Sequence, residues 1–150
     1  MKILVDADSC RREARDLILR SAARLKIKAI FAANRLIPGI PAPEMELCPA
    51  GEGAADDRIV DLAKSGDLVL TRDLPLAERL VDAGVTVLDD RGRVFTKENI
   101  RQQRSLRDFA VDLAESGMGM ERIPTFNKKD LKKLADSLDR ELTRLLRLGV

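Results

Sequence analysis

At 150 residues the chain has the usual size of one domain, and its 45% content of apolar residues excludes an intrinsically disordered protein. Histidine is absent, which excludes catalytic systems that pair serine or cysteine with histidine. Residues 1–90 carry 13 basic and 16 acidic side chains, a net charge of −3. Residues 91–150 carry 14 basic and 9 acidic side chains, a net charge of +5. This asymmetry suits a cation-holding site beside a surface that meets a polyanion.

Apolar runs of strand length alternate with helical patterns along the first 90 residues. A strand over residues 3–5 ends at Asp6, and Ser9 is placed to cap a helix that runs to about residue 26. Further strands are predicted at 29–33, 45–48, 67–71 and 85–88, with helices at 54–64 and 75–83. This alternation predicts an α/β fold with a mainly parallel sheet covered on both faces.

From about residue 96 the pattern is helical. In the first of these helices a set of apolar side chains at helical spacing is expected to face the sheet: Leu106, Phe109, Ala110, Leu113 and Ala114. The last helix begins near Lys128 and carries an apolar stripe of Leu131, Leu134, Leu138, Leu142 and Leu145. We therefore predict one α/β domain over residues 1–150 with a helical C-terminal part.

The two cysteines and the apolar runs indicate the compartment. Cys10 and Cys48 are far apart and lack CxxC spacing, which predicts two reduced, partly buried thiols. No apolar run approaches the roughly 20 residues that span a membrane, and charge follows the first apolar segment directly, unlike in a signal peptide. We expect a cytoplasmic protein that does not associate with membranes.

Acidic and polar side chains follow the ends of successive predicted strands, where α/β sheets bind their ligands. They are Asp6 and Asp8 after the first strand, Asn34 after the second, Asp56 and Asp57 after the third, and Thr71 and Asp73 after the fourth. Gathered carboxylates repel one another unless protons, basic groups or a cation compensate. Mg²⁺ and Mn²⁺ accept oxygen ligands and assist phosphate cleavage, so the pattern predicts a metal site.

Each of these side chains also has a purely structural interpretation. Asp8 can support the cap of the first helix, and Asp56-Asp57 can serve the dipole of theirs. Asp73 can cap the helix that follows it. The pair Asp89-Asp90 precedes Arg-Gly and is more typical of a turn than of a site. The recurrence of aspartate at strand ends favours one shared site of Asp6, Asp8, Asp56 or Asp57, and Asp73.

A basic series lies in the predicted helix after residue 96. Arg101, Arg104 and Arg107 recur at helical spacing and could approach phosphates, although a solvated helix face explains them equally well. The lysines of the last helix allow the same two interpretations.

Several motifs, in this order, resemble the bacterial YaiI/YqxD family. They are VDADSC at 5–10, AAN at 32–34, PAGEGAADDRIV at 49–60, GDLVLTRDLPLA at 66–77, LDDRG at 88–92 and RSLRDF at 104–109, so the resemblance covers nearly the whole chain. The DAD opening and the GDLV-T-D-PLA block are the most specific. The family's opening usually continues as DADACP, whereas Ser9 and Arg11 stand here in place of alanine and proline.

This resemblance implies a PIN-like nuclease fold, a three-layer α/β/α domain whose acidic residues match those of metal-dependent nucleases. In that comparison Asp6 matches the first-strand aspartate and Asp73 the acid after the central strand. Asp56 or Asp57 matches the helix-borne acid, and Asp8 is an additional acidic neighbour.

Our leading hypothesis is a Mg²⁺- or Mn²⁺-dependent nuclease that acts on RNA or DNA. Asp6 and Asp73 are expected to bind the metal, Asp57 or Asp56 to complete the coordination, and Asp8 to flank it. Asn34 and Thr71 are expected to orient substrate or water, and Arg101 and Arg104 to approach phosphates. Because only 3% of residues are aromatic, recognition should rely on the nucleic-acid backbone and shape rather than on base stacking.

Two other functions are consistent with parts of the pattern. Asp6 and Asp8, Thr71 and Asp89-Asp90 imitate the motif order of haloacid-dehalogenase-type phosphatases, but no lysine lies between the threonine and the acidic pair. The other alternative is a non-catalytic RNA- or protein-binding module that retains the acidic pocket and binds through its basic C-terminal part.

Overall fold

The structure, a computed structural model, describes residues 1–51, 53–115 and 126–148, with the backbone alone for 107–115. Five strands form one parallel sheet in the order β3-β2-β1-β4-β5. The strands are β1 (Lys2–Asp6), β2 (Lys28–Ala33), β3 (Met45–Leu47), β4 (Leu68–Leu70) and β5 (Thr86–Leu88). Ile3 pairs with Ala29 on one side and with Leu68 on the other, so β1 is the central strand. The predicted parallel sheet is confirmed.

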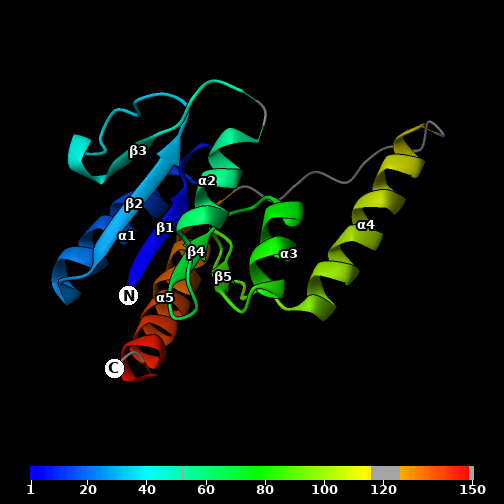
Figure 1. The fold of residues 1–150 in the computed structure, drawn as a ribbon. Helices are drawn as coiled ribbons and strands as arrows, with labels where there is room; N and C mark the ends of the chain where they lie inside the picture. The colour runs from blue at the N-terminus through cyan, green and yellow to red at the C-terminus, as the bar shows by residue number, and fades with distance from the viewer. Residues whose placement is uncertain (52, 116–125, 149–150) are drawn as a thin grey trace.

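Helices cover both faces of the sheet and make three layers (Figure 1). Ile3 and Val5 face the layer of α1 (Arg12–Leu25) and α5 (Lys128–Leu148), and Leu4 between them faces α2 (Ala54–Leu62) and α3 (Leu74–Asp82). Alternate strand residues point to opposite faces, so a strand buried on both sides must be apolar throughout. This is why the strands appear in the sequence as continuous apolar runs.

The first long helix begins later than the sequence predicts. A short 3-10 helix, η1 (Ala7–Ser9), follows β1, and α1 has Arg11 at its N-cap with no side-chain capping bond. The Ser9 hydroxyl instead donates to the carbonyl oxygen of Asp6 at 3.2 Å and accepts from the backbone N–H of Arg72 at 3.2 Å. The predicted cap at Ser9 was wrong because η1 binds the loop after β4, and the alternative role of Asp8 in supporting that cap therefore has no basis.

Helix α4 (Lys97–Glu115) packs its first part near α3 and then runs away from the sheet (Figure 1). Leu106 is 68% exposed, so the prediction that it faces the sheet was wrong. Phe109, Ala110, Leu113 and Ala114 carried the same prediction, and their side chains lie outside the described residues.

The apolar stripe of the last helix is confirmed as a core element. Leu134, Leu138, Leu142 and Leu145 are buried against the layer of α1, whereas Leu131 at the start of the stripe is half-buried. Burying a leucine side chain contributes about 2 kcal/mol each, so this stripe fixes α5 firmly beneath the sheet.

The two cysteines are free thiols, as predicted, with Cys48 buried and Cys10 partly so. Among the described helices, none combines the length and apolarity needed to cross a bilayer.

Candidate active site

The strand order produces a switch point at the centre of the sheet. From β1 the chain continues outward to β2 and β3, crosses back through α2, and then adds β4 and β5 on the other side of β1. The loops after β1 and β4 therefore diverge, and such crevices are where open α/β sheets bind ligands. An open pocket of about 510 Å³ lies at these strand ends.

Four carboxylates line this pocket, which we call the acidic pocket: Asp6, Asp8, Asp56 and Asp73. They come from three segments, namely the end of β1 with η1, the first turn of α2, and the loop after β4. The other lining residues are Ser9, Asn34, Gly51, Gly53, Ala55 and Arg72. The structure therefore brings together Asn34 and four of the five aspartates that the sequence singled out.

The side chain of Thr71 forms hydrogen bonds with both Asp6 and Asp73. Its buried hydroxyl donates to Asp6 Oδ2 at 2.9 Å and accepts from the backbone N–H of Asp73 at 3.0 Å. Thr71 is only 2% exposed and does not line the pocket, so its position suits the orientation of Asp6 rather than contact with a ligand.

Asp73 combines the two roles that the sequence left open. Its Oδ1 accepts from the backbone N–H of Leu76 at 3.0 Å, which caps α3, and Pro75 occupies the first turn, where a missing N–H costs nothing. The same side chain lines the acidic pocket. The cap fixes the direction of the carboxylate, so the structural role also serves the site.

The acidic pocket concentrates negative charge. Burial raises the pKa of Asp6 above its usual value, the hydrogen bond from Thr71 opposes this, and the charges of Asp73 and Asp8 raise the pKa further. Burial, followed by the charges of Asp6 and Asp73, raises the pKa of Asp56 to about 6. The carboxylates are therefore close enough to disfavour one another's ionisation.

Asp57 lies outside the acidic pocket. It is exposed on α2, where its Oδ1 accepts from Arg79 at 3.0 Å. Of the two acids in the first turn of α2, Asp56 is the one that the helix directs to the pocket. Across the described ranges, no three carboxylate or thiol side chains are arranged to hold a metal ion by themselves.

Two glycines just before α2, Gly51 and Gly53, line the acidic pocket. Gly53 occupies the N-cap with φ of +78°, a left-handed conformation that favours glycine, and Gly51 also lines the pocket. Neither glycine was predicted from the sequence to belong to the site. The signal was the spacing of two glycines just before the acidic pair.

Arg101 and Arg104 do not line the acidic pocket. They line a smaller cavity between α3 and α4, where Arg104 forms an ion pair with Glu78 at 2.9 Å. The side chain of Arg107 lies outside the described residues.

The pair Asp89-Asp90 forms the turn that the sequence favoured. Asp89 Oδ1 accepts from the backbone N–H groups of Arg91 and Arg93, both at 2.9 Å. Neither aspartate lines the acidic pocket. The arrangement of a haloacid-dehalogenase-type phosphatase, in which this pair would join Asp6, is therefore not formed.

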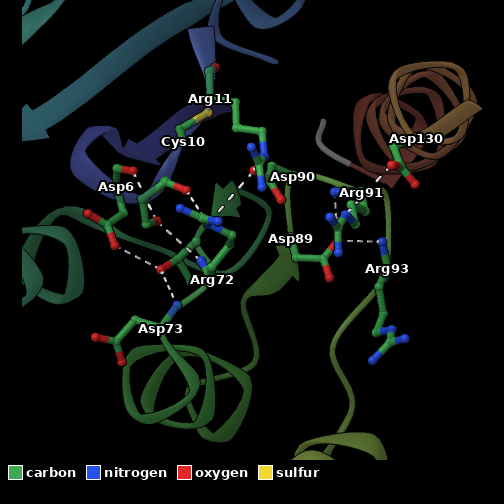
Figure 2. A network of polar contacts seen from close by, with 12 residues as sticks. Asp6, Cys10, Arg11, Arg72, Asp73, Asp89, Asp90, Arg91, Arg93 and Asp130 are labelled. Carbon is green, nitrogen blue, oxygen red and sulfur yellow. Dashed lines mark hydrogen bonds and ion pairs between the residues drawn. The ribbon is translucent and has the colours of Figure 1, made fainter. Parts of the chain in front are cut away.

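Arg72 is the main site residue that the sequence analysis missed. Its Nε donates to the carbonyl oxygen of Ser9 at 2.6 Å and lies 3.8 Å from Asp90 Oδ2, while Arg11 approaches the same oxygen at 3.4 Å. Figure 2 shows Arg72 between the Asp6 and Asp73 side and the Asp90 side. Ser9 and Arg11, the two positions that depart from the usual DADACP opening, both belong to this network.

The comparisons with known proteins agree with the motifs. Residues 4–144 match the family described as "Uncharacterized BCR, YaiI/YqxD family". A UPF0178 protein of Treponema pallidum is 47% identical over 99% of this chain and 85% of its own length, and one of Myxococcus xanthus is 43% identical over 98% of this chain and 97% of its own. A UPF0178 protein of Treponema denticola is 42% identical over 98% of this chain and 95% of its own length. The comparison with solved structures found no match.

The family match spans nearly the whole chain and includes the three segments that carry Asp6, Asp56 and Asp73. The full-length similarity to three bacterial proteins is consistent with it. The chain belongs to the YaiI/YqxD family.

Proposed function

We propose that the protein is a divalent-metal-dependent nuclease with a PIN-like fold, which hydrolyses phosphodiester bonds in RNA or DNA at the acidic pocket. The observation that carries this proposal is that Asp6, Asp56 and Asp73 line one pocket at the switch point of the sheet. A carboxylate cluster of this kind costs stability when it is empty of cations, and a hard cation relieves the repulsion.

The residues present fit Mg²⁺ or Mn²⁺. The donors that line the pocket are carboxylate, amide and hydroxyl oxygens, which hard cations prefer, and the chain has no histidine to favour softer metals. Mg²⁺ is commonly held by one or two carboxylates together with water and substrate phosphate. A set of fewer than three converging carboxylates is therefore compatible with such an ion.

Asp6 and Asp73 would hold the cation, with Asp56 rather than Asp57 as the helix-borne carboxylate and Asp8 at the edge. When bound, a divalent cation supplies Lewis acidity toward a phosphate oxygen and lowers the pKa of water. The chain supplies the positioning: Thr71 orients Asp6 and the α3 cap orients Asp73. Arg72, at the rim of the pocket, is placed to neutralise charge on a phosphate.

A cleavage assay on mixed RNA and DNA oligonucleotides with Mn²⁺ tests the proposal. The test variant is Asp6→Asn/Asp73→Asn, because asparagine keeps the shape of both side chains and still caps a helix. The matched control is Asp16→Asn/Asp61→Asn, which removes two exposed carboxylates outside the pocket. We expect activity in the wild type and the control, and a loss of at least about a hundredfold in the test variant.

The result that would overturn the proposal is cleavage that survives in the test variant, or no cleavage by any of the proteins with Mn²⁺ or Mg²⁺. Binding of an oligonucleotide without cleavage would favour the non-catalytic module instead.

A further inference from the structure

A second and larger cleft adjoins the acidic pocket. Its volume is about 900 Å³, and Arg72 lines both cavities. The cleft lies between the turn after β5 and the first half of α5, and we call it the basic cleft. Its cationic lining residues are Arg11, Arg72, Arg91, Arg93, Lys133 and Arg140.

Gly92 lets the two walls of the basic cleft approach each other. Its φ is +85°, and a Cβ atom at this position would lie 2.6 Å from the carbonyl oxygen of Lys133 on α5. The turn after β5 can therefore press against the backbone of α5 only because residue 92 has no side chain. This contact places Arg91 and Arg93 opposite Lys133.

The basic cleft also contains four carboxylates, and three of them hold its walls in place. Asp89 closes the turn through two backbone N–H groups. Asp130 accepts from the backbone N–H of Asn127 at the start of α5, and Asp90 is buried beside Arg11 and Arg72. The fourth carboxylate, Asp136, is exposed, so six cations stand against four carboxylates in the lining and leave a net positive charge.

Three of the cations that line the basic cleft form no ion pair with a carboxylate of the described residues. Within the described part of the chain, Arg93, Lys133 and Arg140 have no carboxylate within 4 Å, and Arg140 contacts the Ser137 hydroxyl at 3.4 Å. All three side chains belong to exposed residues. Uncompensated cations on one concave surface attract an anion with several charges.

Arg72 links the basic cleft to the acidic pocket. Asp90 is only 4% exposed, and its Oδ2 lies 3.4 Å from Arg11 Nε and 3.8 Å from Arg72 Nε, beyond the 2.7–2.9 Å typical of charge-assisted hydrogen bonds. Arg11 also lies over the ring of Phe126, 5.1 Å from its centroid, which fixes one side of the network. Arg72 lines both cavities, and its side chain is 47% exposed. Figure 2 shows its contacts on the side of Asp90.

The chemistry of the basic cleft fits a phosphate backbone better than an acidic peptide. Five of the six cationic lining residues are arginines, whose guanidinium groups match phosphate oxygens with paired N–H donors. With a cation bound, the adjoining acidic pocket would accept a phosphodiester. The phosphodiester backbone of a nucleic acid is a ligand that both cavities accommodate at once.

We propose that the basic cleft binds the sugar-phosphate backbone of a single nucleic-acid strand. Arg72, which lines both cavities, would contact the strand where it enters the acidic pocket. The direction of the strand toward a cleavage site rests on the proposed function, whereas binding in the cleft does not. RNA and DNA share this backbone chemistry, and the test below separates them.

The experiment measures fluorescence anisotropy of labelled oligouridylate and oligothymidylate of about ten nucleotides, a length within the range of known single-strand sites. EDTA is present, so that cleavage does not interfere. The test variant is Arg93→Gln/Lys133→Gln/Arg140→Gln. The control, Arg20→Gln/Lys28→Gln/Lys132→Gln, removes three exposed positive charges that do not line the cleft. Circular dichroism and thermal melting confirm that each variant is folded.

We expect the test variant to bind at least about tenfold more weakly than the wild type, with the slope of log K against log [salt] reduced by about 2. The control should stay within about twofold. A preference for the RNA or the DNA oligomer identifies the natural strand.

Equal losses in the test and control variants would show an effect of net charge alone and overturn the proposal. So would undetectable binding of both oligomers by the wild type, or tighter binding of polyglutamate than of either oligomer. Binding lost only in the test variant, with no Mn²⁺-dependent cleavage, would retain the basic cleft and reject the nuclease. Mn²⁺-dependent cleavage that is as fast in the test variant as in the wild type would retain the nuclease and reject the basic cleft.

Discussion

The hydroxyl of Thr71, at the end of β4, donates a hydrogen bond of 2.9 Å to Asp6 at the end of the adjacent strand β1. The two residues are 65 positions apart in the chain and meet because β1 and β4 pair in parallel. The bond holds one carboxylate oxygen of Asp6, which leaves the rest of the group to face the acidic pocket. A buried threonine thus connects the register of the sheet to the direction of a candidate metal ligand.

Replacing Thr71 with valine should lower the free energy of unfolding by about 1–3 kcal/mol. The change keeps the volume but removes the donor to Asp6 and the acceptor for the Asp73 N–H, and it leaves buried polar groups unpaired. Urea denaturation measures the effect. Thr71→Ser is the control, because it retains the hydroxyl and should keep most of the stability that the two hydrogen bonds contribute. An equal fall in the free energy of unfolding in both variants would show that the methyl group, not the hydrogen bonding, matters.

Replacing Asp56 with asparagine should raise the melting temperature by a few degrees at pH 7.5. The pKa of about 6 in the folded protein exceeds the roughly 3.9 of an exposed aspartate. The folded state therefore binds more protons than the unfolded chain between these two values, and stability falls as the pH rises through this window. The variant lacks that loss, so its advantage should shrink toward zero at pH 4.

Calorimetry in EDTA at both pH values checks the prediction for Asp56. A variant that melts no higher than the wild type at pH 7.5 would contradict the account of a strained acidic pocket. Adding Mn²⁺ should stabilise the wild type more than the variant, since only the wild type keeps the full set of carboxylates.

Replacing Gly92 with alanine should cost about 2–4 kcal/mol, because the new Cβ atom requires both a left-handed backbone and a shift of α5. Gly84→Ala is the matched control. Gly84 has a similar φ of +79°, but a Cβ atom there would meet nothing within 4 Å, so only the backbone cost of about 1–2 kcal/mol should remain. Equal losses in urea denaturation would show that the turn and α5 do not press together as described.

Cys10 should resist alkylation in the folded protein. Burial and the charge of Asp90 raise the pKa of its thiol to about 12, so little thiolate exists at neutral pH. In a Cys48→Ser variant, iodoacetamide at pH 7.5 should modify Cys10 at least about a hundredfold more slowly than in the urea-unfolded chain. Mass spectrometry follows the reaction, and comparable rates in the two states would contradict the placement of Cys10.

Local sequence patterns were enough to predict the sheet and most of the acidic pocket. The apolar runs became strands, and the aspartates at their ends met because parallel strands share one carboxyl edge. The choice between Asp56 and Asp57 was not predictable, because neighbouring residues on a helix differ by 100° in direction and the orientation of α2 depends on its packing against the sheet.

Features that depend on distant contacts were missed or wrong. The sequence favoured Ser9 as a helix cap, but its hydroxyl donates to the carbonyl oxygen of Asp6 and accepts from the Arg72 N–H in the loop after β4. Leu106 seemed a core residue because its spacing was helical, yet α4 leaves the sheet. The bridging position of Arg72 depends on Ser9 and Asp90 together, and nothing in the local sequence joins those three residues.

The most direct test of the central claim is the anomalous difference density of crystals grown with Mn²⁺. We predict a peak in the acidic pocket, between Asp6, Asp73 and Asp56, that disappears in crystals of the Asp6→Asn/Asp73→Asn variant. A wild-type map with no peak in this pocket at saturating Mn²⁺, or with peaks only elsewhere on the molecule, would contradict it.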